Sequence, residues 1–185
     1  MTLTSPSPVT LRPLDEELLP ALLAAAVAGA DPREVMPTDG ADGGPAGWTD
    51  EQRDAFVRFH RSRSLGADRA EDVYAVVVAE TGETGQVEES VAGAARLAPG
   101  PEPDAVEAGL WLGRSYRGRG LGTAVFARLA GTAREGGAAR LFARTAAANA
   151  ATRRLLTAAG ADLERHGDGT VTAWLALRRP VPRPE

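Results

Sequence analysis

The residues best suited to chemistry form a glycine-rich stretch in the second half of the chain, Arg117-Gly118-Arg119-Gly120-Leu121-Gly122. An alternating apolar pattern predicts a strand just before it, over residues 105–112. Leu121, Val125 and Leu129 recur at helical spacing and predict a helix just after it. Glycine lets the backbone approach an anion closely, and the first turn of a helix offers N–H groups without intrahelical partners. The stretch therefore predicts a phosphate-binding loop.

The spacing of the glycines does not fit two common phosphate loops. A Walker A loop needs Lys before Ser or Thr, and this chain contains no Lys. A dinucleotide fingerprint needs Gly-x-Gly-x-x-Gly after the first strand of the fold, which this stretch does not match. Two other interpretations stay open, a flexible basic surface turn and a site for the phosphates of a nucleotide.

The pattern Arg-x-x-Gly-x-Gly that begins at Arg117, with Tyr116 before it, resembles the pyrophosphate loop of the GNAT superfamily of acyl-CoA-dependent N-acetyltransferases. The resemblance extends through Asn149 and Gly160 and covers roughly residues 90–165. It implies that the loop amides bind the pyrophosphate of acetyl-CoA. It also implies that the strand over residues 105–112 separates from its neighbour and offers backbone groups to the pantetheine amides.

Asn149 starts a predicted helix, where the resemblance implies a contact with pantetheine and where Asn would also serve as a plain N-cap. The residues assigned to the cofactor on these grounds are Leu110, Trp111, Leu112, Arg117, Gly118, Arg119, Gly120, Leu121, Gly122, Thr123 and Asn149.

Two residues are candidates for the general base. Glu107 is a lone carboxylate in an apolar strand, on the face that carries Gly109 and Trp111, although a salt bridge to one of the many arginines would also account for it. His60 is the second candidate, with a structural or solvated helix residue as the alternative. Members of the superfamily often carry Tyr as general acid seven residues after the Asn. This sequence has Leu156 there, so either another group protonates the leaving thiolate or none is needed.

Residues 33–66 are predicted to shape the pocket for the acceptor. A Gly-, Asp- and Pro-rich loop over residues 29–48 is long for a compact domain, which indicates function or disorder. Thr49 and Gln52 then form a capping box that opens a helix to about residue 64. The aromatic residues assigned to the acceptor are Trp48, Phe56, Phe59 and Trp111, with the core as the alternative for Phe56 and Phe59.

The order of the predicted elements, β-α-α-β-β-β-α-β-α-β, differs from the alternation of a doubly wound sheet. The resemblance implies a mixed α/β (α+β) GNAT-like fold, with a central, mostly antiparallel sheet of about six or seven strands, splayed at the cofactor site and flanked by about four helices. We expect a polar connection over residues 80–89 and a last strand over residues 171–177. We also expect a disordered lead-in over residues 1–7, a single acetyltransferase-like domain over residues 8–178 and a proline-rich tail over residues 179–185.

Composition narrows the classes of function. The absence of Cys excludes disulfides, thiolate metal sites and a Cys nucleophile, and two His residues are too few for a His-rich metal site. A net charge of −4 argues against binding nucleic acid or a membrane through basic charge. No apolar run reaches transmembrane length and the N-terminus has no signal-like core, so we expect a cytoplasmic protein.

The sequence therefore predicts an enzyme that transfers an acetyl group from acetyl-CoA to a primary amine, either of a small molecule or of a peptide N-terminus. The attack would be direct, in a ternary complex with a general base, and no metal, nucleic acid or membrane is expected to take part. A homodimer is left open. The alternative is an acyl-CoA-binding module without catalysis, acting as a sensor or a scaffold.

Overall fold

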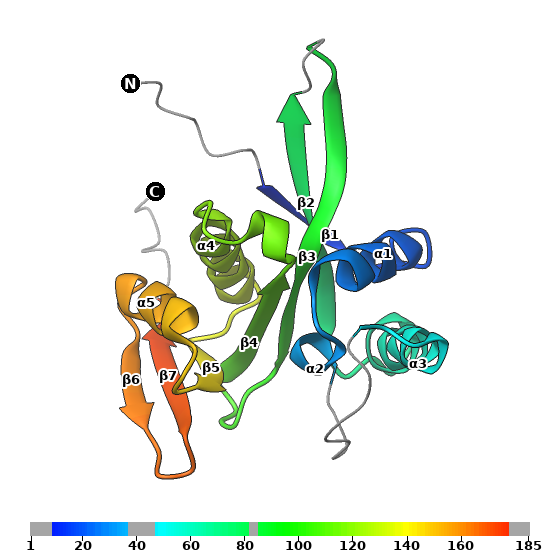
Figure 1. The fold of residues 1–185 in the computed structure, drawn as a ribbon. Helices are drawn as coiled ribbons and strands as arrows, with labels where there is room; N and C mark the ends of the chain where they lie inside the picture. Colours follow the sequence, from blue (N-terminus) through cyan, green and yellow to red (C-terminus); the bar gives the residue numbers. More distant parts are fainter. Residues whose placement is uncertain (1–8, 37–46, 82–84, 178–185) are drawn as a thin grey trace, which may run out of the picture.

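The computed structural model describes residues 9–36, 47–81 and 85–177. Seven strands form one sheet in the order β1-β2-β3-β4-β5-β7-β6, and helices cover both of its faces (Figure 1). The strands are β1 Val9–Pro13, β2 Asp72–Thr81, β3 Val87–Pro99, β4 Ala105–Leu112, β5 Arg140–Ala146, β6 Asp162–Arg165 and β7 Thr170–Ala176. The α-helices are α1 Leu19–Gly29, α2 Pro32–Val35, α3 Asp50–His60, α4 Leu121–Glu135 and α5 Ala150–Ala158. The mixed, mostly antiparallel sheet confirms the predicted fold class, whereas the lead-in over residues 1–7 and the tail over residues 179–185 lie outside the described residues.

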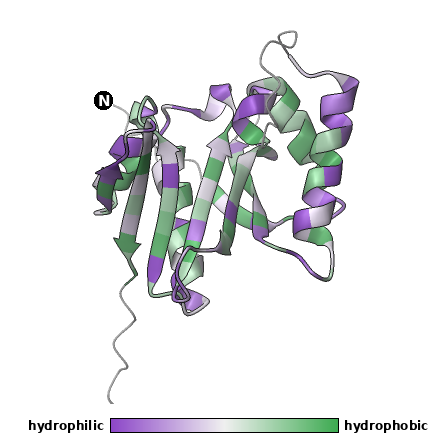
Figure 2. Ribbon diagram, turned by 90° about the horizontal axis from the view of Figure 1, so that it is seen from below, coloured by the Kyte–Doolittle hydropathy of each residue, from purple (hydrophilic) through white to green (hydrophobic). Residues whose placement is uncertain are grey.

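Two apolar cores lie on opposite faces of the sheet. The larger core packs α4 and α5 on the strands around Val76, Leu141 and Ala173. The smaller core packs α1 and α3 on the other face, around Val73 and Ala94. Hydrophobic segments run along the strands between these helical layers (Figure 2). Helices thus pack on both faces of the sheet and hold its strands in place.

The helices begin where local chemistry predicts. Thr49 Oγ1 accepts the Gln52 backbone N–H at 3.2 Å and Gln52 Oε1 accepts the Thr49 N–H at 2.9 Å, which confirms the capping box of α3. α1 begins only at Leu19, with a proline in its first turn, where a missing N–H costs nothing. α3 continues into a π-helical turn, Arg61–Leu65.

Two expectations about the strands are wrong. Both ends of the polar connection over residues 80–89 are strand, because β2 and β3 stay paired as far as Thr81 and Val87 in an arm that extends from the sheet. Exposed strands need no apolar pattern, so the sequence gives little sign of them. β6 was not predicted either, since its four residues contain a single apolar side chain. It pairs with β7 and completes the seven strands.

The sheet opens between β4 and β5. These parallel strands pair only at Ala105↔Arg140, Val106↔Leu141 and Glu107↔Phe142. β4 then continues to Leu112 and β5 to Ala146 without further pairing to each other. This confirms the predicted splay, and the two diverging strand segments are called the seam below. None of the helices among the described residues combines the length and apolar character needed to cross a membrane.

Candidate active site

The glycine-rich stretch forms a tight loop that leads directly into α4. Gly118 and Gly120 have φ values of +74° and +78°, a left-handed conformation that other residues rarely adopt. A Cβ at either position would have open space around it, so backbone conformation, rather than crowding within the protein, explains these glycines. Among the described residues, no acceptor receives a hydrogen bond from the N–H groups of residues 118–123. Six free amides at a helix N-terminus suit a phosphate group.

Arg117 holds this loop against the rest of the protein. Its Nε donates to the Leu112 carbonyl at 2.8 Å, and a terminal nitrogen donates to Glu34 Oε2 of α2 at 2.6 Å. Leu112, one of the three strand residues assigned to the cofactor, therefore already has a partner at its carbonyl. The side chain of Arg117 positions the loop, and its anion-binding groups are the amides that follow it.

Arg119 and Tyr116 fasten the loop to the β2–β3 arm. The Arg119 guanidinium pairs with Glu80 and lies 5.7 Å from the centre of the Tyr116 ring. The Tyr116 hydroxyl is 2.9 Å from the Ser90 hydroxyl. The loop is consequently held from both sides, by α2 through Arg117 and by the arm through these two residues.

A cavity of about 150 Å³ lies in the seam, on the face covered by α4 and α5. Residues 108–110 of β4 and 143–145 of β5 line it, together with Asn149, just before α5, and Leu156 of α5. Asn149 Oδ1 accepts the Thr152 N–H at 3.1 Å, so this residue caps α5 and also reaches the cavity. Leu156 is buried in the larger core and supplies no proton at the position where the superfamily often has Tyr.

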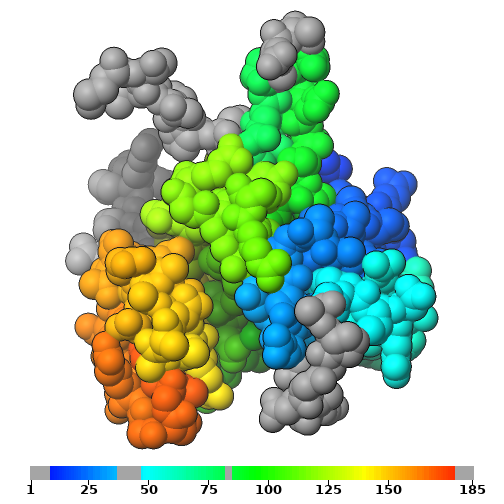
Figure 3. Space-filling model, viewed as in Figure 1, coloured from blue at the N-terminus to red at the C-terminus, as the bar shows by residue number. Residues whose placement is uncertain are grey.

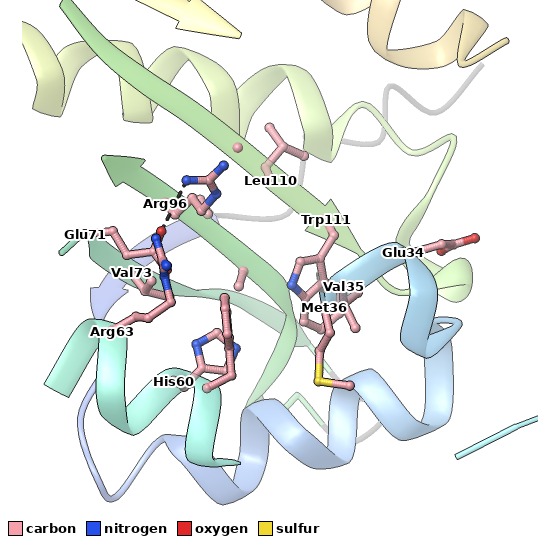
Figure 4. Close-up of a pocket in the computed structure, with 14 residues that line it drawn as sticks. Glu34, Val35, Met36, His60, Arg63, Glu71, Val73, Arg96, Leu110 and Trp111 are labelled. Carbon is pink, nitrogen blue, oxygen red and sulfur yellow. Dashed lines mark hydrogen bonds and ion pairs between the residues drawn. The ribbon is translucent and has the colours of Figure 1, made fainter. Parts of the chain in front are cut away.

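A second cavity of about 430 Å³ lies on the other face of β4 (Figure 4). Its lining comes from α2, α3, the π-helical turn, β2, β3 and β4. Gly109 and Leu110 line this cavity and the seam cavity alike, so β4 is their common wall. In the space-filling view β4 lies recessed between α5 and α2 (Figure 3). The cavity of about 430 Å³ is called the acceptor cavity below, because Phe59 and Trp111, which were predicted to contact the acceptor, line it.

A chain of charged side chains runs along one side of the acceptor cavity. Glu107 Oε1 lies 2.6 Å from a terminal nitrogen of Arg96, whose other terminal nitrogen lies 3.2 Å from Glu71 Oε2. Glu71 Oε1 in turn lies 3.5 Å from Arg63 Nε. Arg96 crosses β4 at Gly109, where a Cβ would come within 2.9 Å of its Nε. Glu107 does not itself line the cavity, but it reaches the lining through Arg96.

Glu71 is the functional candidate that the sequence did not reveal. Its side chain is 2% exposed and lines the acceptor cavity. It stands in a charged turn before β2, where nothing in the sequence distinguishes it from the solvated acidic residues around it. The π-helical turn brings Arg63 to it, and a backbone hydrogen bond from the Glu71 N–H to the Arg63 carbonyl fixes the pair.

His60 lines the same cavity and is 4% exposed, so the solvated alternative is wrong. Its ring packs against Phe56 and Phe59, with centroid distances of 4.4 Å and 5.3 Å. Burial lowers the pKa of His60 to about 4, which leaves the imidazole neutral at pH 7. Neither ring nitrogen has a hydrogen-bond partner among the described residues.

The four aromatic residues assigned to the acceptor occupy different places. Trp111 and Phe59 line the acceptor cavity. Phe56 is fully buried in the smaller core. The Trp48 indole packs edge-on against Phe56 and donates from Nε1 to the Ala30 carbonyl at 2.9 Å, behind the cavity lining. The structure thus brings two of the four to the cavity, and the other two belong to the smaller core or pack against it.

Comparison with known protein families decides which family this geometry belongs to. The sequence model described as Acetyltransferase (GNAT) domain matches residues 9–162, most of the chain. The chain belongs to the GNAT acetyltransferase family. Membership implies acetyl transfer from acetyl-CoA as the general activity. Comparison with curated proteins finds no match.

Solved structures of GNAT proteins share the fold at low sequence identity. An N-acetyltransferase from Staphylococcus aureus Mu50 is 20% identical with a TM-score of 0.60, over 93% of this chain and 100% of that one. The putative acetyltransferase yncA from Salmonella typhimurium, solved with acetyl-CoA, is 20% identical with a TM-score of 0.58, over 96% and 98%. The spermidine/spermine N-acetyltransferase SpeG from Vibrio cholerae is 13% identical with a TM-score of 0.60, over 92% and 95%. These similarities concern the fold of the GNAT chain.

Proposed function

We propose that this GNAT protein transfers the acetyl group of acetyl-CoA to a primary amine held in the acceptor cavity. The observation that carries the proposal is the common wall. Gly109 and Leu110 of β4 line the seam cavity on one side and the acceptor cavity on the other. A thioester in the seam and an amine in the acceptor cavity would therefore approach each other at residues 109 and 110 of β4, as direct attack in a ternary complex requires.

The chain's own groups fit acetyl-CoA along the seam. The free amides of residues 118–123 suit the pyrophosphate, and the unpaired edge of β4 suits the amides of the pantetheine arm. Asn149 stands at the cavity between them and has a side-chain amide N–H₂ to offer. These groups bind and orient the thioester, while the protein supplies no covalent nucleophile, since it contains no Cys.

Glu107 is the proposed general base. As the amine nitrogen bonds to the thioester carbonyl carbon and the C–S bond breaks, one amine proton must leave. Glu107 would take it at Oε2, directly or through one water, because Oε1 is held by Arg96. His60 is the second candidate, but burial depresses its pKa to about 4, far below the range in which a base works well at pH 7.

The amine class of the acceptor draws support from the fold neighbours and from the cavity. One neighbour is described as a spermidine/spermine N-acetyltransferase, so this fold accommodates primary amines. The cavity volume of about 430 Å³ suits a small amine or the first residues of a peptide. The alternative, an acyl-CoA-binding module without catalysis, is favoured by the buried Leu156, which leaves the usual general-acid position apolar.

Release of free CoA thiol from acetyl-CoA, measured with a thiol reagent across a panel of amines, tests the proposal. We expect amine-dependent thiol release in the wild-type protein and its loss in a Gly109→Phe variant, because a side chain at this position would point toward Arg96 and obstruct the acceptor cavity. An acetyl-CoA melting shift without thiol release for any amine or N-terminal peptide would instead support the binding module.

A further inference from the structure

The acceptor cavity contains buried polar atoms that the protein itself does not satisfy. Glu71 Oε1 and both ring nitrogens of His60 make no hydrogen bond to the described residues, although their side chains are almost completely buried. Arg63 Nε approaches Glu71 Oε1 only to 3.5 Å, an ion pair without a hydrogen bond. Buried polar groups are nearly always hydrogen-bonded to protein or to water, so these atoms at a cavity call for a partner from outside the chain, either water or a polar group of a ligand.

The charges around these atoms select the kind of ligand group. An ammonium could donate to Glu71, but it would lie beside the guanidinium groups of Arg63 and Arg96. A carboxylate could face Arg63, but it would lie beside Glu71, whose free oxygen can only accept. The neutral imidazole of His60 offers one donor and one acceptor. A neutral group that both donates and accepts satisfies all of these atoms and carries no charge into the cavity.

Resting on the acetyl transfer proposed above, we propose that Glu71 and His60 recognise a hydroxyl or carboxamide group that the amine acceptor carries away from its reactive nitrogen. Met36, Phe59 and Trp111 supply the apolar walls of the same cavity and would contact the carbon chain between the two ends. The favoured acceptors are then amino alcohols and amino amides, including the first residues of a peptide, rather than diamines or amino acids.

A matched series of primary amines tests this selectivity. At each of several chain lengths, kcat/KM is measured for the alkylamine, the amino alcohol, the amino amide, the diamine and the amino acid. We expect the wild-type protein to prefer the amino alcohol or the amino amide to the alkylamine by roughly ten- to hundredfold, the range for hydrogen bonds to a charged group. Equal or better turnover of the diamine or the amino acid would overturn the proposal.

Two variants and one control assign the preference to these residues. Glu71→Gln and His60→Leu should each lower, severalfold or more, the ratio of kcat/KM for the amino alcohol or amino amide to kcat/KM for the alkylamine. Glu16→Gln is the matched control, because it removes a carboxylate from an exposed pair with Arg61, next to His60 in sequence but outside the cavity lining. An unchanged preference in both cavity variants would overturn the proposal.

A direct binding measurement separates this inference from the proposed function. Calorimetry with CoA present follows binding of the amino amide and of the alkylamine, with no need for turnover. Absence of thiol release with every amine would reject the acetyl transfer. Tighter binding of the amino amide, weakened in Glu71→Gln and in His60→Leu, would still support recognition by these two residues, whereas equal binding of both amines would refute it.

Discussion

Glu107 is the last residue of β4 that pairs with β5, so its backbone lies where the seam begins to open. Glu107→Gln keeps the shape and removes the basicity. We expect kcat to fall about a hundredfold, at the lower end of the usual contribution of a general base, with acetyl-CoA binding retained. The pH–rate profile should lose its acidic limb. A variant with wild-type kcat and an unchanged acidic limb would show that another group, or water, accepts the proton.

His60 should make the stability of the protein depend on pH. Burial lowers its pKa from 6.5 to about 4, so between these values the unfolded chain binds a proton that the folded protein does not. This contribution to stability is complete above pH 6.5 and is lost as the pH falls toward 4. At pH 5 we expect a loss of about 2 kcal/mol in the unfolding free energy.

Urea unfolding at pH 7 and pH 5 measures this effect, with His60→Leu as the comparison. The variant should show a smaller loss by about the same amount, because the other titrating groups are common to both proteins. Equal pH dependence in the two proteins would mean that the imidazole becomes protonated within the fold.

At the scale of elements, the loop before α4 depends on its left-handed glycines. Gly120→Ala places a Cβ in open space but at φ +78°, so the loop must shift and the amides of residues 118–123 must move. We expect a smaller rise in melting temperature with acetyl-CoA. The wild-type protein should gain about 2.7 kcal/mol at a hundredfold excess over Kd.

Gly131→Ala is the control for the loop variant. Gly131 lies within α4 and a Cβ there also meets open space, but without a positive φ. Alanine should stabilise the helix by up to about 1 kcal/mol and leave the acetyl-CoA shift unchanged. The assignment of the loop would fail if Gly120→Ala kept the full shift as well.

The elements also show which features the sequence could predict. The capping box, the glycine loop and the helical spacing in α4 are local signals, and each appears where it was predicted. The arm of β2 and β3 and the strand β6 were missed, because exposed strands carry no apolar alternation. An alternation of apolar residues indicates a strand with one buried face, and these segments are not buried.

The residues of the site also separate into those that the local sequence indicates and those that depend on tertiary contacts. Trp111 and Phe59 were predicted to contact the acceptor, and both line the cavity proposed for it. Glu71 escaped notice because its burial depends on Arg63 and Arg96, which approach it from other elements. The ion pair that occupies Glu107 Oε1 is a tertiary contact of the same kind. The residues next to Glu71 and Glu107 in the sequence do not indicate such tertiary contacts.

At the scale of the whole molecule, the seam divides the sheet into a four-stranded part and a three-stranded part joined by three residue pairs. Acetyl-CoA bound along the seam should slow amide hydrogen exchange in residues 105–112 and 140–146. Peptide-resolved exchange measured with and without acetyl-CoA checks this, with β1 as the internal reference because it pairs with β2, far from the seam in strand order. Unchanged exchange on both sides of the seam would exclude binding there.

The short pairing between β4 and β5 also has a mechanical consequence. A sheet normally transmits force through a continuous ladder of hydrogen bonds, and here that ladder narrows to three residue pairs. The pantetheine arm, bonded to the edge of β4, would extend the ladder with a strand that is not part of the polypeptide. We therefore expect the two parts of the sheet to move less relative to each other while acetyl-CoA is bound, and more after CoA leaves. The hydrogen bonds between β4 and the pantetheine arm would then form and break once in each turnover.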